Sequence, residues 1–258
     1  MAKEQTELQT THNNLPMKLE NIQPGDDELY NPEDPVLVYA KIRHKDLKGD
    51  DGKKVICPAG GFVFSDGRPD MEVLTVAVIG ARRGRVYFEG LEDTQPKCKS
   101  LDGINGTELG PCAECSFGQF LNSKSPKCKE IRNLLLVELA GEALSDAYIL
   151  TLGPSGLKPW RLHDNQVLRL ARRSTPKITA APHFLLRARF TTEYRELPAA
   201  HFVPVITTEE AVSSALAEEL RKQRKVTAKL FSQGHEGQAF EAEDFTGNKD
   251  GDDEGLPF

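Results

Sequence analysis

The sequence lacks the features of several large protein classes. No apolar run in its 258 residues approaches the roughly 20 residues that a membrane helix requires. The first residues, MAKEQTELQTTHNN, contain neither the apolar segment of a secretory signal nor an Arg-rich amphipathic pattern. We therefore expect a cytoplasmic protein that does not associate with membranes.

Catalytic signatures are absent as well. The phosphate-binding pattern GxxxxGK[ST], the dinucleotide-binding pattern GxGxxG and the zinc-protease pattern HExxH do not occur. The 6 histidines are scattered, with no informative spacing to a carboxylate. Acidic residues concentrate at the two ends of the chain, where the metal ligands of a nuclease would not be held rigidly. The sequence therefore does not indicate an enzyme.

The net charge of −6 hides an uneven distribution. Residues 1–34 contain two basic and eight acidic side chains, and residues 233–258 contain one basic and eight acidic side chains. The body between these ends has a net charge of +7. A basic body is typical of a protein that binds a polyanion. An acidic tail that only improves solubility is the alternative interpretation of the charge pattern.

Short β-branched and aromatic runs, separated by turn residues, dominate from Pro35 onward. They predict a mainly β fold, either a barrel or a sandwich. Connections between strands are expected at residues 49–52 and 81–84. The expected strands are Val36–Ile42, Gly61–Phe64, Glu72–Gly80, Arg85–Glu89, Leu134–Leu139, Tyr148–Leu152, Phe184–Tyr194 and Phe202–Ile206.

Two segments have helical spacing. The first is Leu157–Leu170, in which we expect Trp160 to pack against the barrel. The second runs from Ala211 to about Leu230, and a capping box of Thr207 and Glu210 is expected to open it. The composition of the ends predicts an irregular acidic arm at 1–34, a folded domain at 35–231 and a disordered acidic tail at 232–258.

Four of the 5 cysteines, Cys98, Cys112, Cys115 and Cys128, fall in one window with the spacing C-x13-C-x2-C-x12-C. Thiolates separated by two residues can bind a tetrahedral ion from a tight turn, and a second pair completes the site. The window has little aliphatic content, so a cross-link must stabilise it, and a reducing cytosol disfavours disulfides. We predict one structural Zn²⁺ in an insertion spanning residues 96–130. Redox chemistry at the CxxC pair is the weaker alternative, and Cys57 is expected to be a separate, buried thiol.

Basic and aromatic side chains interleave through the predicted barrel. Single-stranded nucleic acid requires both kinds, because cations contact the phosphates while aromatic faces stack on unpaired bases. Alternation along Phe184–Tyr194 places Arg187 and Arg189 on the face opposite the apolar residues. The residues expected to contact DNA are Arg68, Arg82, Arg83, Arg85, Tyr87, Lys97, Lys99, Phe117, Phe120, Arg187 and Arg189.

The last eight residues, GDDEGLPF, resemble the tip of bacterial single-stranded-DNA-binding proteins, which ends Asp-Asp-Asp-Ile-Pro-Phe. Gly255 replaces the last acid of that tip, and Leu replaces Ile. The matching residues are Asp252, Asp253 and Glu254 for the acids and Leu256, Pro257 and Phe258 for the apolar end. The cysteine block, in KCKSLDG, GPCAEC and Cys128-Lys129, is similar to the zinc-containing single-stranded-DNA-binding proteins of some bacteriophages.

These resemblances imply an oligonucleotide-binding (OB) barrel with an inserted four-cysteine zinc ribbon. They imply sequence-tolerant binding of single-stranded DNA in phage DNA replication or recombination, inside a bacterial host cell. The tip is then expected to bind replication or recombination proteins. Two alternatives stay open: a zinc-ribbon transcription cofactor that contacts RNA polymerase, and a metal-dependent nuclease or annealing enzyme.

Overall fold

The computed structural model describes much of the chain from Val38 to Gln233. The described residues are 38–44, 47–48, 55–57, 59–90, 96–100, 102–120, 126–196 and 201–233. They all belong to one compact unit, Val36–Phe258. The predicted arm at 1–34, the connection at 49–52 and residues 234–258 of the predicted tail lie outside the described residues. Ser232 and Gln233, predicted to begin the tail, belong to the second helix instead.

The described chain is mainly β. Strands of the main sheet are β1 (Val38–Ile42), β4 (Phe62–Phe64), β5 (Leu74–Tyr87), β6 (Cys98–Ser100), β9 (Lys129–Ala140), β10 (Ala143–Leu152), β11 (Leu186–Arg195) and β12 (His201–Ala211). Two small hairpins are formed by β2 (Leu47–Lys48) with β3 (Val55–Cys57) and by β7 (Asn105–Gly106) with β8 (Gly110–Pro111). The helices are α1 (Pro154–Ser174) and α2 (Ser214–Gln233), and short 3-10 turns cover Ser116–Gly118 and His183–Leu185. Within the described residues, no helix has the length and apolar content that crossing a membrane requires.

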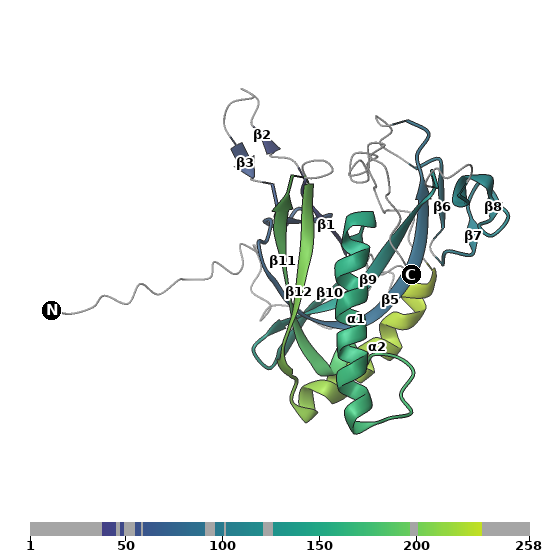
Figure 1. Cartoon of the computed structure of the whole chain (residues 1–258). Helices are drawn as coiled ribbons and strands as arrows, with labels where there is room; N and C mark the ends of the chain where they lie inside the picture. The colour runs from purple at the N-terminus through teal and green to yellow at the C-terminus, as the bar shows by residue number, and fades with distance from the viewer. Residues whose placement is uncertain are drawn as a thin grey trace, which may run out of the picture. The chain divides into compact units, whose positions relative to one another are not determined.

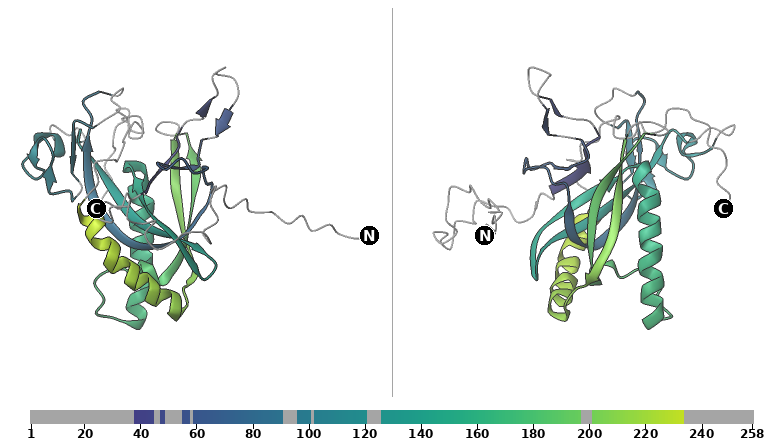
Figure 2. Two further views of the ribbon diagram at one scale, coloured as in Figure 1. Left: turned by 180° about the vertical axis from the view of Figure 1, so that it is seen from behind. Right: turned by 60° about the vertical axis from the view of Figure 1, so that its left-hand side comes forward.

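One strongly curved sheet organises the unit (Figures 1 and 2). Its order is β12-β11-β5-β9-β10-β1-β4, with β6 paired to β5. β1 runs parallel to β10, and the other neighbours are antiparallel. The two ends of the sheet approach each other, since the Thr192 hydroxyl of β11 donates a hydrogen bond to the Gly60 carbonyl. The predictions of a mainly β fold and of two helices are therefore confirmed, and the sheet curls into a half-barrel.

Gly60 allows this approach of the sheet ends. Its φ is 94°, in the left-handed region that favours glycine. A Cβ at this position would lie 2.6 Å from the ring of Phe202 in β12, closer than any real contact. The amide of Phe202 in turn donates a hydrogen bond of 3.2 Å to His44 Nδ1, just after β1.

Buried residues form layers on both faces of the sheet. On β5, Val76 belongs to the inner cluster, to which α1 contributes Trp160. The neighbouring Ala77 belongs to the outer cluster, to which α2 contributes Leu220. Alternation along a strand explains this division, because successive side chains point to opposite faces. Trp160 is 2% exposed, as expected for a residue packed against the barrel.

The predicted break between strands at residues 81–84 is wrong. β5 continues through Gly84, which lies opposite Ile131 of β9. A Cβ at Gly84 would lie 2.9 Å both from the Ile131 side chain and from the Ser100 carbonyl oxygen of β6. This glycine therefore serves close packing between strands rather than a turn, and the continuous ladder with β9 outweighs the turn preference of the local sequence.

The predicted capping box is also wrong. Thr207 and Glu210 lie in β12, which pairs with β11 through Ala211. The helix begins at Ser214, and the Ser213 hydroxyl accepts a hydrogen bond from the Leu216 amide at 3.3 Å, the arrangement of an N-cap. Strand pairing with β11 overrides the local helical signal.

A buried histidine pair links α1 to the turn before β11. The rings of His163 and His183 stack with their centroids 5.3 Å apart, and both lie beside Trp160. His183 Nε2 lies 2.8 Å from Asp164 Oδ1. Burial lowers the pKa of His163 to about 4, with His183 acting in the same direction and Asp164 against it.

The histidine pair predicts acid sensitivity. The unfolded chain protonates His163 near pH 6.5 and the folded chain only near pH 4, so the free energy of unfolding should fall as the pH decreases through this window. The slope from this residue is at most roughly 1.4 kcal/mol per pH unit. In urea denaturation, His163→Phe should lose less stability than wild type between about pH 7.5 and about pH 5. Equal losses in the two proteins would contradict this role, since His183 titrates in both.

Candidate nucleic-acid interface and metal centre

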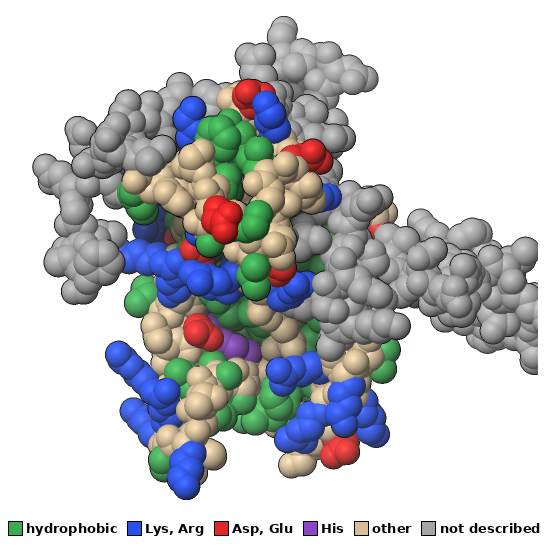
Figure 3. Space-filling model, turned by 90° about the vertical axis from the view of Figure 1, so that its right-hand side faces the viewer, with side chains coloured by type: hydrophobic (Ala, Val, Ile, Leu, Met, Phe, Trp, Pro, Cys, Tyr) green, Lys and Arg blue, Asp and Glu red, His purple; other side chains and the backbone are tan. Residues whose placement is uncertain are grey.

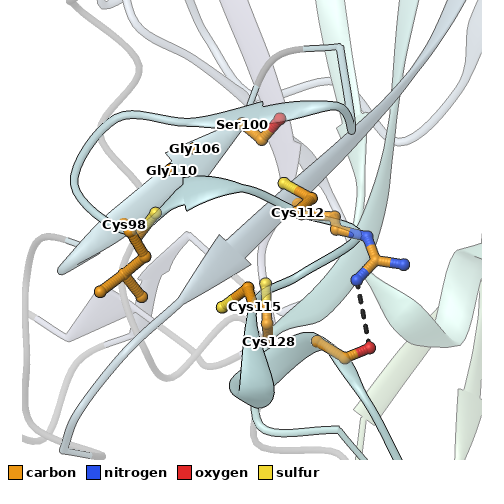
Figure 4. A pocket seen from close by; sticks show the side chains of 10 residues that line it. Cys98, Ser100, Gly106, Gly110, Cys112, Cys115 and Cys128 are labelled. Atoms are coloured by element: carbon orange, nitrogen blue, oxygen red, sulfur yellow. Dashed lines mark hydrogen bonds between the residues drawn. The ribbon is translucent and has the colours of Figure 1, made fainter.

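The four clustered cysteines line one pocket beside the end of β5. Cys98 opens β6, and Cys112 follows β8 directly. Cys115 precedes the 3-10 turn at Ser116–Gly118, and Cys128 precedes β9. Figure 4 shows the four side chains around the pocket. Its other lining residues are Arg85, Ser100, Gly106, Leu109, Gly110 and Gly118.

Backbone hydrogen bonds shape the loop that carries the thiols. The Asp102 carboxylate accepts hydrogen bonds from the amides of Ile104 and Asn105, at 2.7 and 3.0 Å. These amides hold the pKa of Asp102 below its usual value. The Cys112 amide donates to the Ile104 carbonyl at 2.7 Å, which attaches the second cysteine to the same turn. Local polar contacts therefore replace the apolar core that this segment lacks.

The pocket has the composition of a thiolate-rich metal site. Cys98, Cys112, Cys115 and Cys128 are all free thiols. Gly106 leaves room beside Cys98, because a Cβ there would lie 2.7 Å from the Cys98 sulfur. Burial raises the pKa of the Cys128 thiol to about 11, the other three cysteines act in the same direction, and Arg85 opposes them. Within the described residues no three or more ligand side chains are gathered tightly enough to hold a metal as they stand.

Cys57 lies apart from this set in the sequence. It occupies β3, which pairs with β2. The side chains of β3 lie outside the described atoms, so its predicted burial remains a prediction.

Three arginines surround one carboxylate on the face of the sheet next to the pocket. Arg83 of β5 places Nε 3.2 Å from Glu130 Oε1, and Arg161 of α1 places Nη2 3.4 Å from Oε2. Arg132, two residues along β9, has Nη2 3.8 Å from Oε1. Three guanidinium groups and one carboxylate give this arginine cluster a net charge of +2.

The positive charge of the arginine cluster is only partly balanced by Glu130. Burial opposes the ionisation of Glu130, but the three arginines outweigh it and hold the pKa of Glu130 below its usual value. Burial lowers the pKa of Arg132, and the repulsion of Arg83 and Arg161 adds to that effect. Arg132 Nε is buried without a hydrogen-bond partner in the described structure. A second anion at the exposed Arg83 and Arg161 side chains would relieve the repulsion.

The arginine cluster and the cysteine pocket lie on one continuous face. Arg85, which lines the pocket, pairs in register with Glu130 of β9 and with Ser100 of β6. Arg83 lies two residues away on β5, so both side chains point to the same face. Arg85 Nη1 donates to the Gly118 carbonyl at 3.3 Å. In Figure 3, Lys and Arg side chains outnumber acidic ones over the described surface on this side of the molecule.

Tyr87, Phe117 and Phe120 lie on the segments around the cysteine pocket. The predicted contact Arg82 does not, because it pairs with Asn133 and lies on the opposite face of β5 from Arg83. Phe120 is 71% exposed. Tyr87 is 4% exposed and stacks on Phe117 at a centroid distance of 4.4 Å, so its own ring cannot receive a base directly. The Lys127 ammonium lies 5.9 Å from the Phe117 ring centroid.

The two predicted lysines lie on either side of Cys98. Lys97 forms an ion pair with Glu89. Lys99 is in β6, and its amide donates to the Thr107 hydroxyl at 3.2 Å. Both lysines are therefore part of the segment that flanks the cysteine pocket.

The other predicted contacts lie at the far end of the sheet. Arg187 donates to the Gly141 carbonyl at 2.7 Å, in the turn that follows β9. That turn is roughly 35 Å along the strand from Glu130, at about 3.3 Å per residue. Arg68 contacts Asp146 at the same end, and Arg189 pairs with Thr75 near the start of β5. Arg68 also forms an ion pair with Asp66. Arg187 forms ion pairs with Glu142 and Glu210.

Sequence reasoning missed Glu130, Arg132 and Arg161. Alternation along Lys129–Arg132 could have placed Glu130 and Arg132 on one face of a strand. Nothing in the local sequence links them to Arg161, because only the packing of α1 against β9 brings this residue near. No protein-family model, curated protein sequence or solved structure matches the chain.

The arginine cluster predicts that neutralising Glu130 lowers the free energy of unfolding. In Glu130→Gln, three neighbouring guanidinium groups would lose their shared counter-charge. We expect a loss of roughly 1–2 kcal/mol in urea denaturation at low salt, more than for an exposed pair and less than for a fully buried one. Glu218→Gln, at an exposed position of α2, is the matched control and should be neutral. Wild-type stability of Glu130→Gln would contradict this description of the cluster.

Proposed function

We propose that the protein binds single-stranded DNA without sequence preference, as a non-enzymatic component of DNA replication or recombination. The observation that carries this proposal is the arginine cluster around Glu130, which has a net positive charge and keeps Arg83 and Arg161 more than half exposed. Guanidinium groups bind phosphates through two parallel hydrogen bonds. The exposed ring of Phe120, on the segment that lines the cysteine pocket, supplies an aromatic face for an unpaired base.

The connectivity supports an OB-like barrel. β5, β9 and β10 form an antiparallel meander, and α1 follows β10 in the sequence. The hairpin of β11 and β12 comes next, and β11 pairs with β5. OB barrels bind oligonucleotides on strands 2 and 3 and on the loops that join strands 1 to 2 and 4 to 5. The first of these loops corresponds to the cysteine segment. β1, parallel to β10, is an addition that widens the barrel.

We further propose that Cys98, Cys112, Cys115 and Cys128 hold one structural Zn²⁺. Four thiolates are a complete donor set for this ion, leaving no position for substrate. The ion would cross-link the ends of β6, β8 and the segment before β9, and so keep the exposed aromatic and basic side chains of this insertion in place. β6 pairs with β5, which favours an extension of the barrel over an independent zinc ribbon.

Zinc content tests this assignment. Protein purified under reducing conditions without chelator should contain about one zinc per chain. Cys112→Ser should lose it, whereas Cys57→Ser should retain it. Chelation should increase hydrogen exchange in residues 96–128 while β5 and β9 stay protected, because the barrel has its own core. Absence of zinc from the wild-type protein would refute the assignment.

The C-terminal residues support a second role. The acids of the tip carry negative charge, as DNA does. The apolar Leu256, Pro257 and Phe258 suit a small hydrophobic pocket on a replication or recombination protein. Phe258→Ala should therefore spare oligo(dT) affinity and abolish pull-down of such partners from the cytoplasm of a bacterial host. If all partners are still captured, the tip has no such role.

Salt dependence of DNA binding tests the proposed surface. The double variant Arg83→Ala/Arg161→Ala should weaken oligo(dT) binding, because two phosphate contacts are lost. The slope of log K against log[salt] should become shallower by about 0.7 for each contact. Lys222→Ala/Lys225→Ala on α2 removes the same charge from another surface and should leave the slope unchanged.

The salt titration, a hydrolysis assay and a polymerase pull-down together separate the alternatives. An unchanged slope in the Arg83→Ala/Arg161→Ala variant would place the DNA elsewhere. Hydrolysis of the oligonucleotide in Mg²⁺ would favour a nuclease. Capture of RNA polymerase by a protein with no affinity for oligo(dT) would favour the transcription cofactor.

A further inference from the structure

Arg85 is the charged residue of the cysteine pocket. Besides the four cysteines, the described lining residues are Ser100, Leu109, three glycines and Arg85. Of these described residues, Arg85 alone has a cationic side chain, and none has a carboxylate. Arg83, two residues earlier on the same face of β5, belongs to the arginine cluster instead. Two neighbouring arginines of one strand therefore have different surroundings.

The carboxylate directly across the sheet does not hold Arg85. Glu130 lies opposite Arg85 in the pairing of β5 with β9. Within the described structure, the ion pairs of Glu130 are formed with the three arginines of the cluster. Arg85 Nη1 donates to the Gly118 carbonyl at 3.3 Å, the hydrogen bond that is dashed in Figure 4. The guanidinium of Arg85 is therefore directed toward the cysteine segment rather than toward Glu130.

Gly118 leaves space for this guanidinium. It ends the 3-10 turn that follows Cys115, and its amide donates to the Cys115 carbonyl at 3.0 Å. A Cβ on Gly118 would lie 2.6 Å from Arg85 Nη1 and 3.3 Å from the Cys112 carbonyl oxygen. A larger residue at this position would therefore push the Arg85 side chain aside.

A tetrathiolate ion benefits from a neighbouring cation. Four thiolates around one doubly charged ion leave an excess of negative charge. Cys98 and Cys112 are buried, and a buried net charge is costly unless a group of opposite charge lies beside it. A guanidinium stays protonated in proteins and donates several charge-assisted hydrogen bonds. Among the described lining residues, Arg85 is the one that can balance the excess charge.

We propose that Arg85 is a positioning residue of the metal centre, which balances part of the thiolate charge and holds the turn after Cys115 through Gly118. The inference rests on the proposed zinc assignment. It also gives Arg85, predicted from the sequence to contact DNA, a different role. Arg83 is directed to the phosphates of DNA and Arg85 to the metal centre, so loss of Arg85 should weaken zinc binding rather than DNA binding.

The zinc affinity of charge variants of the full chain tests this role. Each protein is titrated with Zn²⁺ in competition with a chromophoric chelator, under reducing conditions. Arg85→Met should lower the affinity about tenfold or more, as is typical when a group that supports metal ligands is removed. Arg85→Lys has a side chain of similar length but keeps the charge, so it should retain most of the wild-type affinity. Arg82→Met, the same change on the opposite face of β5, should leave the affinity unchanged.

Gly118→Ala tests the geometry while the charge is retained. Its Cβ should displace the Arg85 side chain and therefore also weaken zinc binding. In the double variant Arg85→Met/Gly118→Ala the two losses should not add, because both changes remove the same contact. Fully additive losses would show that Gly118 acts independently of Arg85 and would contradict the proposed contact.

The outcomes distinguish this inference from the proposed function. In saturating Zn²⁺, Arg85→Met should leave the salt slope of oligo(dT) binding unchanged, and a shallower slope would return Arg85 to the DNA path. If the wild-type protein binds zinc and Arg85→Met binds it equally tightly, the role of Arg85 is refuted while the zinc assignment stands. Equal losses in Arg85→Lys and Arg85→Met would also refute it, because packing alone would then explain the effect. A wild-type protein without zinc would overturn both.

Discussion

The antiparallel pairing of β5 with β9 is the constraint on which the rest of the structure depends. The two strands pair from Val76 opposite Glu138 to Val86 opposite Lys129. At one end, both faces of this ribbon are buried, by the inner cluster and by α2. At the other end, the ribbon extends past the core and carries β6, the cysteine pocket and the arginine cluster. This ribbon thus connects the packed part of the sheet to a polar site.

The side chains at the end of this ribbon carry a positive charge that is only partly balanced. A single carboxylate, Glu130, holds three guanidinium groups in place without neutralising them. The side chains of Arg83 and Arg161 stay more than half exposed, at 63% and 56%. Arginines that are already oriented lose less conformational entropy when they bind a phosphate. Glu130 also offsets part of the repulsion among the three guanidinium groups.

The sequence predicted which strands and helices the fold contains better than it predicted where they begin and end. Alternating apolar residues identified most strands, and Trp160 was expected to pack on the barrel. The errors at residues 81–84 and at Thr207 have one cause: a local turn or helix signal was overridden by pairing with a distant strand. The four cysteines were predicted from spacing and line one pocket, but Arg132 and Arg161 were missed because tertiary packing alone brings them to Glu130.

The proposed DNA path can be located directly by photo-cross-linking the wild-type protein to oligo(dT) that contains 5-iododeoxyuridine. If the strand crosses the arginine cluster and the cysteine insertion, cross-links will concentrate in peptides that contain Phe117, Phe120 and the start of β9. Cross-links confined to the β9–β10 turn, near Arg187 and Arg68, or an absence of cross-links under conditions that saturate binding, would contradict the account.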